Sequence, residues 1–353
     1  MEKRYIFFIG TLCNGGAERV VSLLASKMAE QGRRVEILTY YESDVAYELN
    51  PKIQVNAVET LTGEKNKLKN LIWLRKYFKN NAKTIISFLA PFNMLAIAVN
   101  LGAGTPIIVA DRNDPEKIPS NCMMRSLRNF LYMFADEVIL QTEKNKAYFN
   151  KIVQKKSSVI YNPVSLGENA GIALRTKKDR KIVTAGRLMQ QKNQKMLVEA
   201  FYEIVKKYPE YTLVIYGDGP CRANLEDLIK KLGIEKNVFM PGNTRELHDQ
   251  IKSAEIFVLS SDYEGMPNAL IEAMCLGIPV ISTKVSGAMD LIIDHENGLL
   301  VDVGNCEGLK NACIELIANK DIAQKCAENA VQLNDELEIS KITRQWIDII
   351  EKW

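Results

Sequence analysis

Residues 264–272 read Glu-Gly-Met-Pro-Asn-Ala-Leu-Ile-Glu, and the chain continues with Ala-Met-Cys-Leu-Gly-Ile-Pro-Val-Ile-Ser. The Gly and Pro residues predict a loop, and the pattern beyond them predicts a helix that begins at Pro267 or Asn268. The apolar side chains that this helix turns toward a core are Leu270, Ile271 and Met274. The run Val280–Ser282 then predicts a buried strand, so this stretch reads as one helix-strand unit of a parallel α/β sheet.

The same stretch has the residue types of a nucleotide-sugar site. A helix N-terminus offers backbone N–H groups and a positive dipole end, which suit a phosphate. Glu272 lies about one turn into the helix and is placed to accept hydrogen bonds from a diol, while Glu264 lies on the loop at the other side of that phosphate. A loop and a capped helix with two solvated glutamates are the alternative.

Short apolar runs alternate with helical patterns along the whole chain. The predicted strands are Tyr5–Ile9, Val35–Tyr40, Ile53–Val58, Thr84–Phe88, Pro106–Ala110, Glu137–Leu140, Val159–Tyr161, Lys181–Ala185, Thr212–Tyr216, Val238–Met240, Ile256–Leu259 and Val280–Ser282. The series breaks at Asn162-Pro163 and the polar stretch that follows. Two doubly wound, Rossmann-like α/β domains are therefore expected, over 1–163 and 164–335, with a last helix over 336–353.

Several strands are followed by loops rich in glycine or basic residues, at the sheet edge where open α/β sheets bind ligands. Gly15-Gly16 lies in the loop Asn-Gly-Gly-Ala-Glu-Arg (14–19), where backbone can approach a phosphate or sugar, or where the glycines only make a tight turn. Gly186-Arg187 and Lys192 can bind phosphate oxygens or form a solvated basic loop. Gly217 opens the next loop.

The three motifs together resemble the retaining glycosyltransferases of family 4. Glu264 to Glu272 is similar to the E-x7-E signature of that family, Gly186-Arg187 with Lys192 resembles its G-R-x4-K element, and the loop 14–19 resembles the N-terminal glycine loop of a subgroup that builds bacterial surface polysaccharides. The resemblance covers essentially the whole chain. It implies a GT-B fold, an active site in the cleft between the two domains, and a C-terminal helix that crosses back onto the first domain.

The resemblance also implies roles for individual residues. Catalytic roles fall to Glu264, Arg187, Lys192 and Arg112, the last because Asp-Arg-Asn-Asp-Pro (111–115) stands where many relatives carry a histidine. The donor-binding set is Gly15, Gly16, Gly186, Gly217, Gly242, Asn243, Met266, Pro267, Asn268 and Glu272. Arg112 has a structural alternative, a salt bridge to Asp111 or Asp114. The two histidines of the chain, His248 and His295, are not expected to be catalytic.

Composition narrows the class of protein and its partners. Seven scattered cysteines without a Cys-x-x-Cys pair indicate a reducing compartment, and no zinc or other metal site is expected. No apolar run approaches the roughly 20 residues of a membrane span, so a cytoplasmic protein is expected. No cofactor is expected either. Residues 1–165 carry 23 Lys and Arg against 15 Asp and Glu, which predicts an anionic partner. No nucleic-acid-binding signature accompanies that charge.

The segment Lys65–Lys83 is predicted to be a helix with two unlike faces. Its basic stripe comprises Lys65, Lys69, Lys76, Lys79 and Lys83, and its apolar stripe comprises Leu68, Leu71, Leu74 and Phe78. Trp73 and Tyr77 lie on one boundary, and Arg75 adds a further charge. Such a helix can pack on its leucines and present lysines to anionic lipid or to a lipid pyrophosphate, or it can be an ordinary solvated face.

These observations predict a retaining transferase that moves a hexose or N-acetylhexosamine from a UDP-sugar to a glycan acceptor. By resemblance, the acceptor is linked to undecaprenyl pyrophosphate, and the enzyme associates peripherally with the inner face of the cell membrane. The alternatives are a UDP-sugar epimerase of similar architecture and a non-catalytic scaffold that binds glycan or phosphate. The sequence leaves the sugar, the acceptor and the linkage open.

Overall fold

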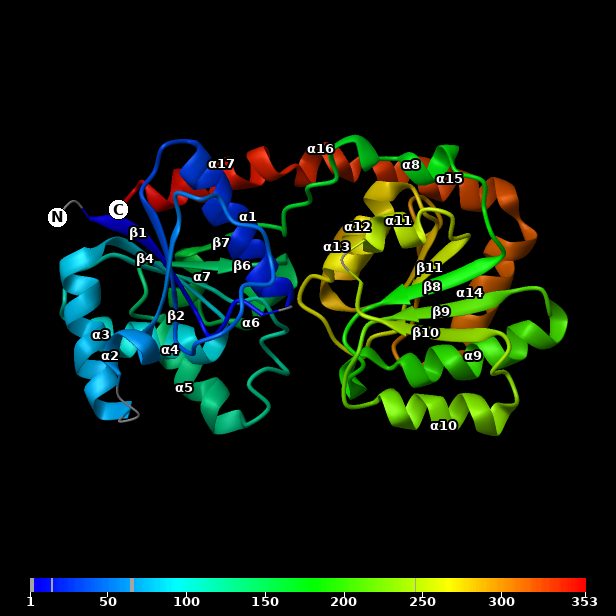
Figure 1. The fold of residues 1–353 in the computed structure, drawn as a ribbon, viewed down its shortest axis with the longest axis horizontal. Helices are drawn as coiled ribbons and strands as arrows, with labels where there is room; N and C mark the ends of the chain where they lie inside the picture. The colour runs from blue at the N-terminus through cyan, green and yellow to red at the C-terminus, as the bar shows by residue number, and fades with distance from the viewer. Residues whose placement is uncertain (1–2, 14, 64–66, 245) are drawn as a thin grey trace. The chain divides into compact units, whose positions relative to one another are not determined.

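The computed structural model describes residues 3–13, 15–63, 67–244 and 246–353, which form two compact units (Figure 1). Unit 1 comprises Met1–Pro163 together with Leu337–Trp353, and unit 2 comprises Val164–Glu336. Asn14 and Lys65, which belong to two of the predicted motifs, lie outside the described residues. Within the described ranges, no helix is long and apolar enough to cross a bilayer.

Unit 1 is built on a seven-stranded parallel sheet with the order β3-β2-β1-β4-β5-β6-β7. The strands are β1 (Arg4–Ile9), β2 (Val35–Thr39), β3 (Gln54–Ala57), β4 (Ala82–Phe88), β5 (Ile107–Ala110), β6 (Glu137–Leu140) and β7 (Ser157–Val159). Its helices are α1 (Gly16–Glu30), α2 (Val58–Thr62), α3 (Lys67–Asn81), α4 (Ala90–Asn100), α5 (Cys122–Tyr132), α6 (Glu143–Tyr148), α7 (Lys151–Lys155) and α17 (Ile339–Ile350).

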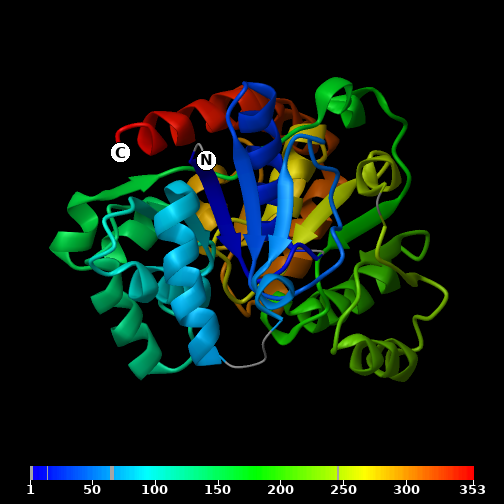
Figure 2. The same ribbon diagram turned by 60° about the vertical axis from the view of Figure 1, so that its left-hand side comes forward.

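Helices cover both faces of this sheet, and for that reason its central strands are almost continuously apolar. Tyr5 of β1 pairs with Val35 on one side and with Thr84 on the other, so β1 lies inside the sheet. Helix α4 packs against both α3 and α5, and α1 packs against α17. Figures 1 and 2 show the layer α3–α4–α5 on one side of the sheet and α1 with α17 on the other.

Unit 2 holds a six-stranded parallel sheet with the order β10-β9-β8-β11-β12-β13. The strands are β8 (Lys181–Ala185), β9 (Thr212–Tyr216), β10 (Val238–Gly242), β11 (Ile256–Leu259), β12 (Val280–Thr283) and β13 (Leu299–Val301). Its helices are η1 (Gly167–Asn169), α8 (Ile172–Arg175), η2 (Gln190–Lys192), α9 (Gln194–Lys207), α10 (Arg222–Leu232), α11 (Leu247–Ile251), α12 (Asn268–Leu276), α13 (Ser286–Leu291), α14 (Cys306–Ala318), α15 (Lys320–Val331) and α16 (Leu333–Leu337). Helix α9 packs with α10 and α14, whereas α12 packs with α8, α11 and α15, so two helical layers enclose the sheet.

The C-terminal helix α17 belongs to unit 1, as the sequence resemblance implied. Trp346 is fully buried there and stacks on Phe88 of β4, with 5.5 Å between the ring centroids. Glu351, just past the helix, accepts hydrogen bonds of 2.8 and 3.0 Å from Arg33. The C-terminal segment therefore packs as part of the same domain as the N-terminal segment.

Several predicted boundaries were wrong. Val58 begins helix α2 instead of ending a strand, and β13 was missed because only three residues pair there. The predicted helix over 65–83 ends at Asn81, and Lys83 lies on β4, where its ammonium donates to the Tyr5 hydroxyl. Leu68, expected to pack inward, is 69% exposed, so the apolar stripe that seats α3 is shorter than predicted.

Candidate active site

Motif-bearing loops of unit 2 follow the carboxyl ends of parallel strands. In the sheet of unit 2, β9 and β10 lie on one side of β8, and β11 lies on the other side. Neighbouring loops diverge at such a switch point, and ligands of open α/β sheets bind there. Gly186-Arg187 and Lys192 follow β8, while Glu264 follows β11, so the two halves of the predicted site meet at the switch point.

Lys192 and Glu264 form a direct ion pair between these two loops. The Ser261 hydroxyl donates a second hydrogen bond of 2.8 Å to the same carboxylate oxygen of Glu264. The carboxylate side chain is only 9% exposed and that of Lys192 21%. An ammonium held beside a largely buried carboxylate is fixed in position, and both groups remain close enough to the surface to meet a ligand.

The backbone around this pair is held in register by a second set of contacts. The Gln191 side-chain amide donates to the Tyr263 carbonyl over 2.8 Å, and the Asp262 N–H donates to the Gln191 carbonyl over 2.8 Å. The Asn193 amide also donates to the Asp262 carboxylate over 2.8 Å. Because these bonds join η2 to the loop after β11, the positions of Lys192 and Glu264 depend on each other.

Glycines bring the neighbouring loops into van der Waals contact. Gly217 has a φ of +125°, and a Cβ built on it would lie 2.1 Å from the Gly186 carbonyl oxygen. A Cβ on Gly219 would lie 2.5 Å from the Leu188 carbonyl oxygen. The loops after β8 and β9 therefore pack backbone to backbone, which only glycine allows at these two positions.

Gly217→Ala is expected to destabilise unit 2 more than Gly233→Ala. Both positions have positive φ, but a Cβ at Gly233 meets no atom within 4 Å, so that change adds backbone strain alone, about 1–2 kcal/mol. At Gly217 a backbone oxygen must also move, which adds about 1–3 kcal/mol. Urea unfolding of the two variants measures the difference, and equal losses would contradict the close approach.

The loop before α12 is packed just as closely. A Cβ on Gly287 of α13 would lie 2.3 Å from the Gly265 carbonyl oxygen and 2.7 Å from the Met266 Cα. Helix α12 begins at Asn268, as predicted, and the residue before it, Pro267, provides no side-chain cap. The loop that leads into α12 is thus fixed by its close packing on α13, and Met266 of this loop is buried.

Glu272 is 4% exposed on α12, and its partner was missed by the sequence analysis. His248 of α11 places its Nε2 atom 3.1 Å from a carboxylate oxygen of Glu272. His248 was not expected to be catalytic, and nothing in the sequence indicated this contact, since α11 is only five residues long and carries no motif. Only the packing of α11 on α12 reveals the contact.

The remaining donor-motif residues lie around this edge of unit 2. Arg187 is exposed, and its carbonyl accepts a hydrogen bond of 3.1 Å from the Gln194 side chain. The Gly217 N–H donates to the Gly242 carbonyl over 2.8 Å, which aligns the loops after β9 and β10. Asn243 is exposed beside it. The predicted donor-binding residues from Gly186 to Glu272 thus all lie in unit 2.

Gly15 and Gly16 lie in unit 1, at the start of α1 and beyond the end of β1. The Gly15 carbonyl accepts hydrogen bonds of 3.0 Å from both the Arg19 N–H and the Tyr47 hydroxyl. Burial raises the pKa of the neighbouring Glu18 carboxyl. The switch point of this sheet falls between β1 and β4, so the glycine loop occupies the position in unit 1 that Gly186 occupies in unit 2.

Arg112 has a different environment from the one predicted. Its guanidinium lies 5.3 Å from the Phe88 ring centroid and 5.2 Å from that of Trp346, and it donates to Asn162 over 3.1 Å. Burial lowers the pKa of Arg112 to about 9. The expected alternative, a salt bridge to Asp111, is made by Arg128 instead, at 3.6 Å. Arg112 therefore packs on α17, and its predicted catalytic role is left as a prediction.

The candidate acceptor residues of α3 divide into two groups. Lys69, Lys76 and Lys79 are exposed. Arg75 donates to the Val99 and Leu101 carbonyls over 2.6 and 2.7 Å, at the C-terminal end of α4, so its charge is engaged in capping. Trp73 stacks on Tyr77, with 4.5 Å between ring centroids, and is partly buried. The lysines are the part of the predicted stripe that faces solvent.

The sequence matches two profiles of one class of enzyme. Residues 14–168 match the family described as Glycosyltransferase Family 4, and residues 168–333 match the family described as Glycosyl transferases group 1. The chain is 30% identical, over 86% of its length and 87% of the relative's, to a Campylobacter jejuni protein. The chain belongs to the family 4 glycosyltransferases.

The names of two relatives indicate a substrate class for those proteins. The Campylobacter jejuni protein just mentioned is named N-acetylgalactosamine-N,N'-diacetylbacillosaminyl-diphospho-undecaprenol 4-alpha-N-acetylgalactosaminyltransferase. A second protein of that organism is 29% identical over 98% of this chain and 97% of its own length, and it is named as an alpha-1,4-N-acetyl-D-galactosaminyltransferase acting on a diNAcBac-PP-undecaprenol-linked glycan. Homologues of this chain are thus transferases of lipid-linked glycans.

The fold is that of the GT-B glycosyltransferases. Anabaena Alr3699/HepE, solved in complex with UDP and glucose, superposes with a TM-score of 0.86 over 100% of both chains at 18% identity. The two parallel sheets of the present chain match its architecture, as the strand-helix alternation predicted. At this identity the likeness bears on the fold alone.

Proposed function

We propose that this glycosyltransferase transfers a hexose or N-acetylhexosamine, with retention, from a UDP-sugar to an undecaprenyl-pyrophosphate-linked glycan in surface polysaccharide or glycoprotein glycan synthesis. The assignment of a UDP-sugar as the donor rests on one observation: the Lys192–Glu264 ion pair lies at the switch point of unit 2, and Glu272 lies one turn into α12. The names of the Campylobacter relatives support an undecaprenyl-pyrophosphate-linked glycan as the acceptor.

Charge stabilisation is the chemistry that these residues offer. In the reaction, the bond from the sugar's anomeric carbon to the diphosphate oxygen breaks while a bond to the acceptor oxygen forms on the same face. The diphosphate leaves with the electron pair, and one of its oxygens takes the acceptor's proton. Lys192 and Arg187 would bind the oxygens on which negative charge develops, and cations already in place stabilise that charge most.

Glu264 would have two tasks in this scheme. It holds the Lys192 ammonium near the place of the leaving group, and it would accept hydrogen bonds from hydroxyls of the transferred sugar. Because residues of the chain supply the positive charge, we propose a metal-independent reaction. Transfer measured with and without EDTA tests this, and a loss that added Mg²⁺ or Mn²⁺ restores would contradict it.

Glu272→Ala is expected to weaken UDP binding about tenfold to a hundredfold, because a buried carboxylate that accepts from ribose hydroxyls is worth roughly 1.5–3 kcal/mol. Glu264→Ala should keep UDP affinity and impair transfer. Calorimetry with UDP and with 2'-deoxy-UDP separates the two roles. The parent protein should bind UDP more tightly than 2'-deoxy-UDP, and Glu272→Ala should bind the two equally. If Glu272→Ala still binds UDP more tightly by the parent's factor, Glu272 does not bind the ribose 2'-hydroxyl.

His248 is proposed to position Glu272 for the ribose. Its Nε2 atom lies 3.1 Å from the carboxylate, so His248→Ala should weaken UDP binding by a smaller factor, about threefold to tenfold. If His248 acts through Glu272, the double variant should bind UDP no more weakly than Glu272→Ala alone. Additive losses in this double-mutant cycle would show that His248 serves the ligand or the fold independently.

The acceptor assignment is tested by a panel of UDP-sugars and acceptors. The purified chain is incubated with each UDP-hexose and UDP-N-acetylhexosamine in the presence of a lipid-pyrophosphate glycan or a water-soluble glycan, and products are identified by mass spectrometry. Transfer with retained anomeric configuration, read by NMR, supports the proposal. Isomerised or hydrolysed UDP-sugar without transfer would identify an epimerase-like enzyme, and neither product would identify a binding protein.

A further inference from the structure

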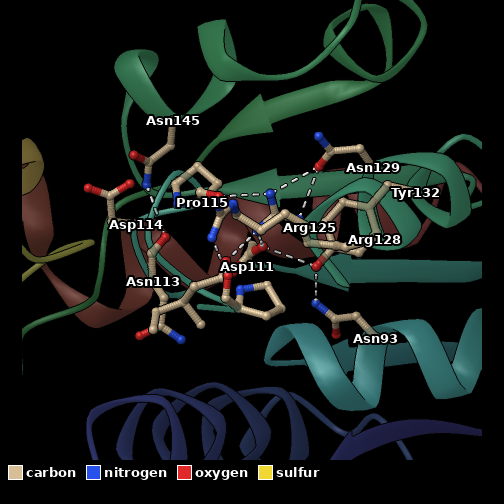
Figure 3. Close-up of polar contacts among 12 residues, drawn as sticks. Asn93, Asp111, Asn113, Asp114, Pro115, Arg125, Arg128, Asn129, Tyr132 and Asn145 are labelled. Carbon is tan, nitrogen blue, oxygen red and sulfur yellow. Dashed lines mark hydrogen bonds and ion pairs between the residues drawn. The ribbon is translucent and has the colours of Figure 1, made fainter. Parts of the chain in front are cut away.

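Helix α5 is folded with its polar side inward. Arg128 and Tyr132, one turn apart, are its buried residues, and both are fully enclosed. The Arg128 guanidinium donates to the Pro115 carbonyl over 2.9 Å and pairs with Asp111 at 3.6 Å. The Tyr132 hydroxyl donates to the same carboxylate over 3.1 Å and accepts from Asn93 of α4 over 2.9 Å (Figure 3).

Three apolar residues of α5 point away from this network. Met123, Leu127 and Phe130 are spaced by four and three residues, which places them on one face of the helix. Their exposed fractions are 72%, 45% and 53%. Phe134, just past the helix, is 48% exposed and packs edge-on against Phe130, with 5.3 Å between ring centroids. A surface helix of a globular protein normally has the opposite arrangement.

The helices beside this face carry charge of one sign. Helices α3, α4 and α5 form one layer, and none of the three contains an acidic residue. Helix α3 supplies the exposed Lys69, Lys76 and Lys79, together with the exposed apolar side chains Leu68 and Ile72. Apolar side chains beside helices whose charged residues are all basic match the two zones of an anionic bilayer, its acyl region and its headgroups.

We propose that the outer face of α5 inserts into an anionic lipid bilayer while the lysines of α3 bind its headgroups. The inference deepens the proposed function, because it names the surface that brings unit 1 to a lipid-linked acceptor. The Arg128 network supplies the support this requires: together with Tyr132, which also packs into the apolar core, it anchors the inner side of α5 and leaves Met123, Leu127 and Phe130 facing outward. Insertion and headgroup binding then depend on different residues.

The experiment is flotation with vesicles of phosphatidylglycerol and phosphatidylcholine, at physiological and at 1 M salt. Exposed charges are screened at 1 M salt, where the Debye length is about 3 Å, whereas apolar insertion persists. Met123→Ser/Leu127→Ser/Phe130→Ser should weaken partitioning roughly a hundredfold and remove the salt-resistant part. The triple lysine variant Lys69→Gln/Lys76→Gln/Lys79→Gln should lose the salt-sensitive part only.

The matched control is Phe239→Ser/Ile293→Ser/Val303→Ser, which removes exposed apolar side chains of unit 2 and should partition like the parent. A Phe130→Trp variant supplies a reporter that keeps the face apolar, and lipids brominated in their acyl chains should quench its added fluorescence. An α5 variant that floats like the parent, or a reporter that is not quenched, would overturn the proposal. So would a parent dimer that the α5 substitutions convert to a monomer without any change in lipid binding.

Failure of this inference is distinguishable from failure of the proposed function. Flotation needs no sugar nucleotide, and transfer to a water-soluble acceptor needs no membrane. The α5 variant should keep transfer to the soluble acceptor at the parent's rate, while transfer to a vesicle-embedded acceptor falls with the partitioning. Equal transfer to both acceptors would overturn the role of α5 and leave the transferase assignment intact.

Discussion

Lys192→Gln is expected to lower turnover roughly 10²–10³-fold, the scale seen when one preorganised charge-stabilising group is removed. The ammonium is held by Glu264 at the switch point of unit 2, where the diphosphate of the donor is proposed to leave. The change removes the charge, keeps a polar side chain and shortens it by one atom, so we expect the loss to fall on the charged transition state more than on ground-state binding. Initial rates with the preferred UDP-sugar at saturation measure it.

The matched control for this variant is Lys195→Gln. Lys195 lies three residues further along, in the first turn of α9, with 69% of its side chain exposed and an ion pair to Glu199 at 3.7 Å. An exposed pair of this kind contributes about 0–1 kcal/mol, so turnover and stability should both stay near the parent's. Equal activity of the two variants would remove Lys192 from the mechanism. A Lys192→Gln protein whose UDP affinity collapsed with turnover unchanged would assign the residue to ground-state binding instead.

The triple change Lys69→Gln/Lys76→Gln/Lys79→Gln is expected to weaken association with anionic vesicles by about a hundredfold or more at physiological salt. Each lysine near an anionic surface is worth about 1 kcal/mol, and the attraction decays over a Debye length of about 8 Å. Binding of UDP should be unaffected because the donor motifs from Gly186 to Glu272 lie in unit 2. Stability should also hold, since Leu74 and Phe78 seat the helix.

Two comparisons make this expectation specific. Lys230→Gln/Lys231→Gln/Lys236→Gln removes the same charge from exposed positions of unit 2 and should change vesicle binding far less. Transfer to a lipid-pyrophosphate acceptor should fall in the α3 variant, and transfer to a water-soluble acceptor should not. An α3 variant that floats and transfers like the parent would mean that the stripe is only a solvated face.

Periodicity was sufficient for most of the architecture. The runs at β1, β4, β8, β9 and β11 are short and apolar because both faces of each sheet are covered, and this signal needs no tertiary information. The start of α12 was also readable, since Pro267 stands immediately before it. Short edge elements were less predictable. Three residues of β13 and the five of α2 carry too little pattern to be distinguished from a loop.

The candidate site was predictable where its residues follow strands along the chain. Lys192 and Glu264 were each identified from a local motif, and the rule that ligands bind at the carboxyl edge of a parallel sheet placed both on that edge. Their direct ion pair was not predictable, because it joins loops 72 residues apart. The contact of His248 with Glu272 was missed for the same reason: α11 and α12 meet only when the second sheet is assembled.

Arg112 and α5 show most clearly where sequence reasoning ends. The cation after β5 was visible in the sequence. Its packing against the Phe88 and Trp346 rings was not, because Trp346 lies on a C-terminal helix more than 220 residues further along the chain. The spacing of Met123, Leu127 and Phe130 could equally have marked a face that packs on the sheet. Only the burial of Arg128 and Tyr132 decides that this apolar face points outward.

By itself, the sequence determined the two parallel sheets, the order of their elements and the family, because hydrophobic period and loop motifs are local properties of the chain. The tertiary structure alone decided which charged groups become partners and which apolar face stays exposed. Those outcomes depend on distances between segments that are remote in sequence, and a buried polar network such as Arg128–Asp111–Tyr132 can reverse the face that a helix turns toward the core.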